Sequence, residues 1–392
     1  MGMSNTMSET NIRLAATEDR FSSDPEVSYT LAAPYYYDEA LFRSEQSRVF
    51  AQSWRFACHR TEIPHTGDYV TLGLDNESIL IIRDKDETIR AFYNVCPHRA
   101  SQLVKPGSSG NKPSGISCPY HSWTFNHDGT LRGASRCERV KNFNKEDFSL
   151  TPVRVEELCG FIFISLNIDA PSLGAQAVGL DDLLNRECTG LEDYSLVARS
   201  DFDGKTNWKV IIDNFIENYH LTLSGPEHKK FADLVSSEEH ESKIRTHDVW
   251  TEFISPAGRP DNSAFQWTEP RNLGGGNDFI TIHLFPDMGF VLFPGVNALS
   301  LFYTRPTGPE TCTLVTSYYA PTTELDEATK AGVHYFSDEL SPEDIELCEG
   351  VQRGLRSRAY HQGRLMVDAE RTGLSEHGVH AFHAWIRSFM LD

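Results

Sequence analysis

Cys96-Pro97-His98 and Cys118-Pro119-Tyr120-His121 are the two stretches from which the fold and chemistry of this chain are best predicted. Each brings one soft thiolate and one imidazole, so together they offer four metal ligands of two kinds. The order Cys-x-His and then Cys-x2-His is the ligand pattern of a [2Fe–2S] cluster in which two cysteines bind one iron and two histidines the other. Zinc also takes two cysteines and two histidines, but zinc fingers place both cysteines before both histidines. The spacing therefore predicts a redox centre.

The residues around these turns resemble those of Rieske non-haem iron oxygenase large (alpha) subunits. Residues 92–99 are similar to the first ligand arm of that family, residues 118–125 to the second arm, and Asp128-Gly129 to the turn that follows. Ala100 stands where the family usually has glycine, and the nineteen residues 99–117 make the connection between the arms slightly longer than usual. Because lengthening a loop costs little free energy, we still expect a Rieske cluster bound by Cys96, His98, Cys118 and His121.

Composition narrows the class of protein. A chain of 392 residues with 39% hydrophobic and 23% charged residues has enough length for two globular domains. A net charge of −20 argues against nucleic-acid binding, which needs clustered Lys and Arg. No apolar run approaches the length of a membrane span, and residues 1–19 lack the layout of a signal peptide. We therefore expect a cytoplasmic protein, not bound to membranes, whose cysteines outside the cluster are free.

The order of expected elements predicts an α+β fold with three parts. Residues 1–53 are an N-terminal arm and helix, 54–166 a small antiparallel β Rieske domain, and 167–392 a larger catalytic domain with an antiparallel sheet covered by helices. In the larger domain we expect strands at 196–202, 279–284, 289–293, 299–304 and 313–319, and helices at 208–223, 326–339, 342–355 and 376–389.

Residues 207–220 resemble the helix that carries the mononuclear iron in this oxygenase family. On one helix Asp213, Glu217 and His220 would be spaced i, i+4 and i+7 and would point the same way. Non-haem Fe(II) oxygenases bind iron through two histidines and one carboxylate, and His220 matches the first histidine of the family. Asn214, on the same helix, is a further candidate catalytic residue.

The second histidine ligand is the main departure from the family pattern. The resemblance places it at position 225, which is glycine here. We expect Gly225-Pro226 to end the helix and His228 to replace the missing ligand. The alternatives are a site that lacks this ligand, or a more distant histidine such as His240 or His247.

The carboxylate ligand is expected from residues 341–349, which are similar to a late acidic helix of the family. Asp344 is the preferred ligand, and Glu343 and Glu346 are the alternatives. A purely structural role is also open, because Ser341 would be a good N-cap and an acidic residue stabilises the first turn of a helix.

The resemblance also implies an assembly. In the family an acidic residue three positions before the first histidine ligand bridges that histidine to a cluster histidine of the neighbouring subunit. Here Glu217 would join His220 to His121 of the partner subunit, giving a short electron route within a homotrimer. In having glutamate at this position, the chain resembles the members of the family that act on quaternary ammonium compounds.

The chain has no glycine-rich motif that would bind NAD or flavin, so electrons from NAD(P)H are expected through a separate reductase or ferredoxin. The resemblance is greatest to choline, glycine betaine, stachydrine and carnitine monooxygenases. It implies a Rieske-type monooxygenase that uses O2 to N-demethylate a betaine-like small molecule. The loop residues Trp250 and Trp267 are the preferred candidates for a cation–π cage, with a place in the apolar core as their alternative. The alternatives are hydroxylation or dihydroxylation of an aromatic acid, and a Rieske electron carrier without a working iron site.

Overall fold

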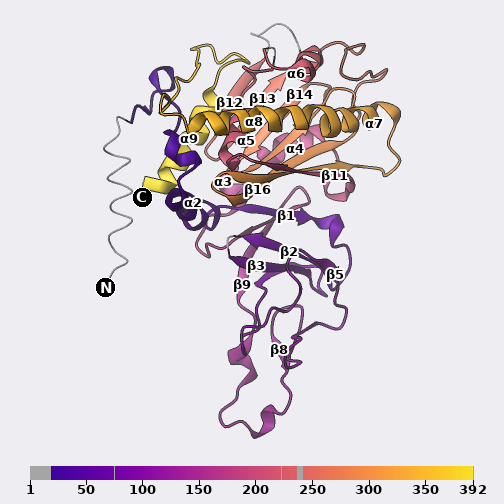
Figure 1. The fold of residues 1–392 in the computed structure, drawn as a ribbon. Helices are drawn as coiled ribbons and strands as arrows, with labels where there is room; N and C mark the ends of the chain where they lie inside the picture. Colours follow the sequence, from indigo (N-terminus) through magenta and orange to yellow (C-terminus); the bar gives the residue numbers. More distant parts are fainter. Residues whose placement is uncertain (1–18, 75, 222, 236–241, 392) are drawn as a thin grey trace. The chain divides into compact units, whose positions relative to one another are not determined.

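The computed structural model describes residues 19–74, 76–221, 223–235 and 242–391, which form two compact units (Figure 1). The smaller unit comprises Gln46–Ala175 and Leu191–Asp193. The larger unit comprises Gln176–Gly190 together with the described residues of Met1–Glu45 and Tyr194–Asp392. Both units combine antiparallel sheets with helices, so the predicted α+β class is confirmed.

The smaller unit is built from two antiparallel sheets. The larger sheet has the strand order β1-β10-β9-β4-β3-β2-β5, and a second sheet has the order β6-β7-β8. Their strands are β1 (Arg55–His59), β2 (Asp68–Leu74), β3 (Glu77–Arg83), β4 (Ile89–Tyr93), β5 (Ser109–Asn111), β6 (Ile116–Ser117), β7 (Thr124–Phe125), β8 (Leu131–Gly133), β9 (Pro152–Leu158) and β10 (Phe161–Ser165).

The larger unit contains one seven-stranded antiparallel sheet in the order β11-β17-β16-β15-β14-β13-β12. Its strands are β11 (Ser195–Gly204), β12 (Lys243–Thr246), β13 (Trp250–Ser255), β14 (Phe279–Leu284), β15 (Met288–Leu292), β16 (Leu299–Gly308) and β17 (Thr311–Ala320). The five strands predicted for this domain are present. Strands β12 and β13 lie outside the predicted strands.

The helices lie mainly in the larger unit, and α8 crosses the sheet beside α5 in Figure 1. The α-helices are α2 (Glu39–Glu45), α3 (Leu173–Gln176), α4 (Leu180–Glu187), α5 (Trp208–Phe215), α6 (Pro226–Phe231), α7 (Glu327–His334), α8 (Ser341–Leu355) and α9 (His377–Leu391). The short 3-10 and π helices are η1 (Pro25–Val27), η2 (Ala33–Tyr36), η3 (Gln46–Phe50), η4 (Arg60–Glu62), η5 (Cys137–Arg139), η6 (Lys145–Phe148), η7 (Leu191–Asp193), η8 (Ala232–Leu234) and η10 (Tyr335–Leu340). None of these helices combines the length and apolar character that a membrane span requires.

The helix predicted over 208–223 is shorter than expected. It begins where the Asn207 side chain accepts a hydrogen bond from the Lys209 N–H at 2.9 Å, and it ends at Phe215. Beyond that point the Glu217 carboxylate accepts the backbone N–H of His220 at 3.2 Å, which offers the chain an alternative to the helical hydrogen bond. The prediction that Asp213, Glu217 and His220 share one helical face is therefore wrong.

A hydrogen-bond clamp sets α8 against α5. The side-chain oxygen of Gln352 accepts the backbone N–H of Asn207 at 2.8 Å, and its amide nitrogen donates to the Tyr36 carbonyl at 3.0 Å. Gln352 is buried, so these bonds are made away from water, where an unpaired amide would cost about 1–3 kcal/mol. The clamp fixes the position of the C-terminal half of α8 relative to the first turn of α5.

A buried ion pair anchors α5 to the N-terminal segment. Lys209 Nζ lies 2.6 Å from Glu45 Oε1, both side chains are fully buried, and Trp208 Nε1 donates to the other carboxylate oxygen at 2.9 Å. Burial raises the pKa of Glu45 and lowers the pKa of Lys209, while the attraction between the two charges opposes both shifts. Each charge is therefore tolerated only because the other is present.

Lys209→Met is expected to lower the free energy of unfolding by about 3–5 kcal/mol, because it leaves the Glu45 carboxylate buried without a partner. The double variant Lys209→Met/Glu45→Gln should recover much of this loss, since glutamine still accepts the Trp208 N–H. The urea midpoint of unfolding measures both changes. Arg43→Met, which removes an exposed ion pair with Glu39, should change stability by about 0.5 kcal/mol or less. Equal losses in the single and double variants would contradict this assignment.

Because His283 on β14 is buried, we expect the protein to lose folding stability as the pH falls. Its ring is fully buried against Phe382 and Trp385, and burial lowers its pKa to about 4. An unfolded histidine takes up a proton near pH 6.5. The unfolded state is therefore favoured as the pH falls from 6.5 to 4, by up to about 1.4 kcal/mol per pH unit.

His283→Gln should remove this contribution, because the glutamine amide can still donate to the Pro286 carbonyl, which lies 3.1 Å from His283 Nε2. Urea midpoints between pH 7 and pH 4.5 should fall less steeply in the variant than in the unchanged protein. Parallel curves for the two proteins would show that His283 does not contribute.

Candidate metal centres

The two predicted cluster turns have the same backbone geometry. In each, the cysteine carbonyl accepts the N–H of the residue four positions on, from Ala100 to Cys96 at 3.0 Å and from Ser122 to Cys118 at 3.0 Å. Ala100 and Ser122 both have a left-handed backbone, with φ of +52° and +57°. Glycine adopts this conformation most easily, which explains the family preference at position 100 and makes Ala100 a mildly strained substitute.

The four predicted cluster ligands lie together. The thiols of Cys96 and Cys118 hydrogen-bond to one another, and backbone N–H groups at positions 98, 99, 120 and 121 bond to the two sulfurs. The rings of His98 and His121 have centroids 4.7 Å apart. Both cysteines are buried, whereas His98 is exposed and His121 half-buried. The thiols therefore form the inner end of this site and the imidazoles the outer end.

The donor set fits an iron–sulfur cluster. Nδ1 of His121 is buried and has no hydrogen-bond partner among the described residues, so it is available as a ligand atom. Trp123 stacks on His98 with a centroid distance of 4.6 Å and an interplanar angle of 6°, which fixes the orientation of that ring. N–H groups directed at the sulfurs are the contacts that stabilise cluster thiolates.

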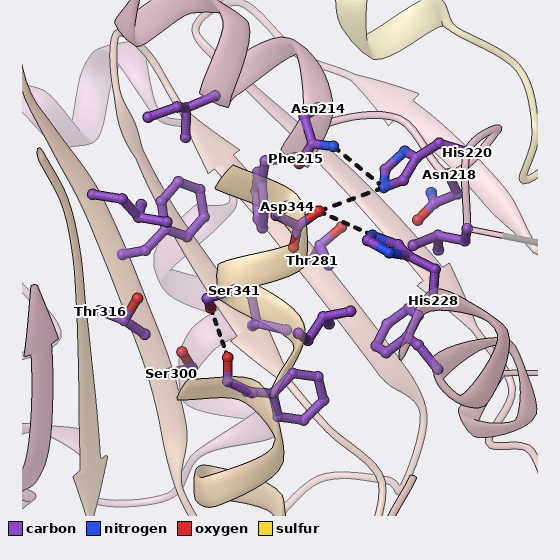
Figure 2. A pocket seen from close by; sticks show the side chains of 18 of the residues that line it. Asn214, Phe215, Asn218, His220, His228, Thr281, Ser300, Thr316, Ser341 and Asp344 are labelled. Atoms are coloured by element: carbon purple, nitrogen blue, oxygen red, sulfur yellow. Dashed lines mark hydrogen bonds and ion pairs between the residues drawn. The ribbon is translucent and has the colours of Figure 1, made fainter. Parts of the chain in front are cut away.

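A second candidate centre is formed by His220, His228 and Asp344, shown in Figure 2. One ligand atom from each lies within 4.8 Å of the other two. Asp344 Oδ1 is 3.0 Å from His228 Nε2 and 3.9 Å from His220 Nε2, and the two rings have centroids 5.0 Å apart. Two imidazoles and a carboxylate on one side of a common point fit a mononuclear Fe(II) with open positions.

A carboxylate holds each histidine ring from behind. Glu217 contacts Nδ1 of His220, and Glu343 Oε1 lies 2.5 Å from Nδ1 of His228. A carboxylate only accepts hydrogen bonds, so Nδ1 is the donor in both contacts. Nε2 of each ring is left on the side of Asp344, where it can bind a metal. Asn214 Nδ2 lies 3.4 Å from His220 Nε2. The orientation of both rings is thus fixed before a metal binds.

Gly225 and Pro226 have a different role from the one expected. They begin the new helix α6, with Gly225 as its N-cap and Pro226 in its first turn. Proline suits that position because its missing N–H is not needed there. His228 follows within the first turn of α6 and is fully buried beside His220.

The other proposed ligands lie elsewhere or cannot be placed. His240 lies outside the described residues. His247 stacks on Trp250 at 3.7 Å and is 3.7 Å from a Glu252 carboxylate oxygen, and it is not one of the three grouped residues. Glu346 is exposed on α8.

The alternative that Asp344 only stabilises the first turn of a helix capped by Ser341 is not supported by the structure. The helix α8 continues directly from η10, so Ser341 is its first residue and the N-cap role expected for Ser341 is wrong. Ser341 Oγ instead donates to the Phe336 carbonyl at 2.6 Å. Asp344 therefore does not lie at a free helix N-terminus.

Asp213 belongs to a hydrogen-bond network that does not include His220. The Tyr36 hydroxyl donates to Asp213 at 2.7 Å, and His383 Nε2 lies 2.9 Å from the other carboxylate oxygen. His383 Nδ1 accepts the Leu31 N–H at 3.2 Å, so its proton is on Nε2 and is donated to Asp213. Asp213 thus links α5 to the N-terminal segment and to α9.

A cavity of about 130 Å³ opens beside the three grouped residues. Its walls come from alternate residues of neighbouring strands, which face the same side of a sheet, and from α5, α6 and the segment around η10. Aromatic rings dominate the lining: Phe215, Phe231, Phe279, Phe293, Phe302, Tyr318 and Phe336. Its polar groups away from the metal site are mainly hydroxyls, from Thr281, Ser300, Thr316 and Ser341. No lysine or arginine occurs among these described lining residues.

Neither predicted cage tryptophan lines this cavity. Trp250 is the first residue of β13 rather than a loop residue, and its Nε1 donates to the Val178 carbonyl at 3.3 Å. Trp267 is buried under Gly295 and beside Phe265. Both side chains belong to the core of the larger unit.

A second cavity, of about 320 Å³, shares Asn214, Glu217, His220 and Cys348 with the first. It is bordered by the carboxylates of Asp213, Glu217 and Glu376. Burial raises the pKa of Glu376 to about 7, and the charges of Glu217 and Asp213 add to the shift. Glu217 and His220 thus separate two hollows of different character.

Two groups of residues escaped the sequence analysis. Glu343 was expected only as an alternative iron ligand. In the structure it contacts Nδ1 of His228 and so supports the imidazole ring of that residue. The phenylalanines of the cavity give no motif, because alternating aromatic residues in a strand are equally typical of a hydrophobic core. The pairing of β14 to β17 brings Phe279 and Phe302 to one face of the sheet, and the helices supply Phe215, Phe231 and Phe336.

Two protein-family models match the chain, the Rieske [2Fe-2S] domain over residues 53–144 and the ring hydroxylating alpha subunit (catalytic domain) over residues 191–392. The chain therefore belongs to the family of Rieske non-haem iron oxygenase alpha subunits, as the resemblance indicated. Its cofactors are accordingly a Rieske [2Fe–2S] cluster and a mononuclear iron.

Relatives that match most of the chain include monooxygenases. The carnitine monooxygenase oxygenase subunit of Acinetobacter baumannii is 37% identical over 94% of this chain and 97% of its own length. The chloroplastic choline monooxygenase of Spinacia oleracea is 27% identical over 93% of this chain and 79% of its own length. These relatives favour a Rieske-type monooxygenase over a ring dioxygenase.

Solved structures agree with this placement. The quaternary ammonium Rieske monooxygenase CntA in complex with L-carnitine has a TM-score of 0.82 at 36% identity, covering 95% of this chain and 98% of the other. Naphthalene 1,2-dioxygenase with indole bound has a TM-score of 0.74 at 19% identity, covering 92% of both chains, and shares the fold.

Proposed function

We propose that this chain is the terminal oxygenase component of an enzyme that N-demethylates a quaternary ammonium compound. The observation that carries the proposal is the group His220, His228 and Asp344 at the end of a cavity walled by aromatic rings. The relatives that are carnitine and choline monooxygenases support the same substrate class.

The proposed residue roles follow from the geometry. His220, His228 and Asp344 hold the mononuclear iron, which supplies O2 activation when it is bound. Cys96, His98, Cys118 and His121 hold the cluster that delivers electrons. Asn214 lies against His220 and borders the substrate cavity, where its amide restrains the position of the ring.

The cavity lining favours a cationic, methylated substrate. A trimethylammonium group is attracted to the faces of aromatic rings by about 0.5–2 kcal/mol per well-placed ring. The formal charges on the described lining are the carboxylates of Glu217 and Asp344, and no lysine or arginine is available to pair with an aromatic acid. The aromatic-acid alternative is therefore less well supported than the quaternary ammonium substrate.

The overall reaction balances with O2 and two electrons. One oxygen atom enters an N-methyl C–H bond to give an N-hydroxymethyl group, and the other leaves as water with two protons. The bond between the nitrogen and the hydroxymethyl carbon then breaks, which releases formaldehyde, a proton and a tertiary amine. The aromatic rings of the lining offer few hydrogen bonds to water near the methyl group during this step.

The assembly and electron supply are part of the proposal. Glu217, which holds His220 at Nδ1, bridges to His121 of the partner subunit in a homotrimer, and a separate reductase or ferredoxin supplies the electrons. In this assignment residues 54–166 are the Rieske domain, 167–392 the catalytic domain, and the protein is cytoplasmic. The six cysteines outside the cluster form no disulfide in the described chain, which is consistent with a reducing compartment.

Iron and acid-labile sulfide per chain test the metal assignment. Anaerobically purified protein should contain three irons and two sulfides, and His228→Ala should contain two irons with an unchanged cluster absorption spectrum. His247→Ala, the matched control at the alternative histidine, should retain three irons. Two irons in the unchanged protein would instead favour the electron-carrier alternative.

The substrate class is tested by a single turnover of the chemically reduced full chain with O2, which needs no reductase. Choline, glycine betaine or L-carnitine should yield formaldehyde in an amount that approaches the chain concentration, whereas benzoate should yield no oxidised product. Phe302→Leu should weaken choline binding by about 2- to 30-fold, because it removes one aromatic face. Binding of the uncharged analogue 3,3-dimethylbutan-1-ol should change much less. Equal weakening for both ligands would contradict the cation–π role.

A further inference from the structure

The space at Gly225 is already occupied by another side chain. A Cβ atom at this position would lie 2.4 Å from Glu343 Oε2, 2.5 Å from its Cδ and 2.7 Å from Oε1. The backbone of Gly225, with φ of −65° and ψ of −171°, is open to any residue, so space alone requires glycine here. A histidine at the usual family position is therefore incompatible with Glu343 as it stands.

Glu343 could swing away from a side chain at position 225 only by giving up its hydrogen bonds. Its carboxylate accepts the backbone N–H groups of Glu227 at 3.3 Å and His228 at 3.0 Å, and Nδ1 of His228 at 2.5 Å. The first two bonds satisfy N–H groups in the first turn of α6, where no helical partner exists. The third fixes the buried His228 ring.

The two carboxylates that hold His228 are consecutive residues of α8. Glu343 contacts Nδ1 and Asp344 contacts Nε2, so one turn of α8 sets both the position and the orientation of the ring. His220 is contacted by Asp344 on α8, while its other partners, Glu217 and Asn214, are close to it in sequence. The relocated histidine therefore depends on α8 more than the histidine at the usual position does.

We infer that Glu343 is the positioning residue for the displaced iron ligand His228, and that Gly225 and Glu343 form a matched pair. Glycine at 225 makes room for the Glu343 carboxylate, and this carboxylate holds His228 where a histidine at 225 would otherwise be needed. The inference rests on the proposed function, because it takes His228 to be an iron ligand.

A set of variants at both positions tests the pairing. Binding of Fe²⁺ is measured on the full chain with its cluster intact and its mononuclear site emptied. Glu343→Ala should weaken binding about 10- to 100-fold, the usual effect of losing a group that orients a ligand. Glu343→Gln should weaken it less, because the amide oxygen still accepts the Nδ1 proton. Glu346→Ala, on the exposed side of the same helix, should bind Fe²⁺ normally.

Gly225→Ala should weaken Fe²⁺ binding in the unchanged background, yet Gly225→Ala/Glu343→Ala should bind no more weakly than Glu343→Ala alone. Gly354→Ala, where a Cβ meets nothing within 4 Å, is the control for the glycine substitution. The visible absorption of Co²⁺ bound in place of iron should shift in Glu343→Ala and return toward normal in Glu343→Gln. A purely structural role for Glu343 would leave that spectrum unchanged.

Two results would overturn the inference. One is Fe²⁺ binding by Glu343→Ala that equals that of Glu346→Ala, and the other is a double variant whose loss is the product of the two single losses. Failure of the proposed function is distinguishable, because His228→Ala would then bind Fe²⁺ as tightly as the unchanged protein. Cluster absorption and thermal unfolding identify any variant that fails to fold, and the Glu343 series decides the question without Gly225→Ala.

Discussion

The metal site depends on the register between α5 and α8. His220 follows α5, His228 lies on α6, and Asp344 on α8 is the residue that contacts both. A shift of one helical residue along α8 would move Asp344 by about 1.5 Å and rotate it by about 100°. The Gln352 clamp, which joins α8 to the start of α5 and to the N-terminal segment, is made of buried hydrogen bonds that resist such a shift. Precision at the candidate iron site therefore comes from a contact two turns further along the helix.

Local sequence patterns predicted the site best where the metal ligands are close together in the sequence. The two cluster turns each span a few residues, and the backbone of each turn is closed by its own hydrogen bonds. For that reason Cys96 and His98, like Cys118 and His121, could be expected to converge without knowledge of the rest of the fold. Five strands of the larger sheet were also recognisable, because their apolar residues are continuous or alternate over five to ten positions.

The second site could be predicted only in part, because it is assembled over long distances in the sequence. The end of α5 at Phe215 depends on Glu217 bonding to the His220 N–H, a side-chain contact that helical periodicity does not reveal. The role of Asp213 depends on Tyr36 and His383, which come from the two ends of the chain. Choosing Asp344 among three nearby acids required family resemblance, and the separate tasks of Glu343 and Glu346 follow from the packing of α8.

The long reach of the Leu31–His383 hydrogen bond has a consequence for biosynthesis. Its partners are 352 residues apart, and a ribosome adding about 5–20 residues per second needs about 20–70 s to make the chain between them. The smaller unit is nearly continuous in sequence and emerges early. The N-terminal segment, with Tyr36 and Glu45, must meanwhile wait for α5 and then for α9. The cluster-bearing unit can thus fold while the chain is still growing, whereas the catalytic unit is completed only after release.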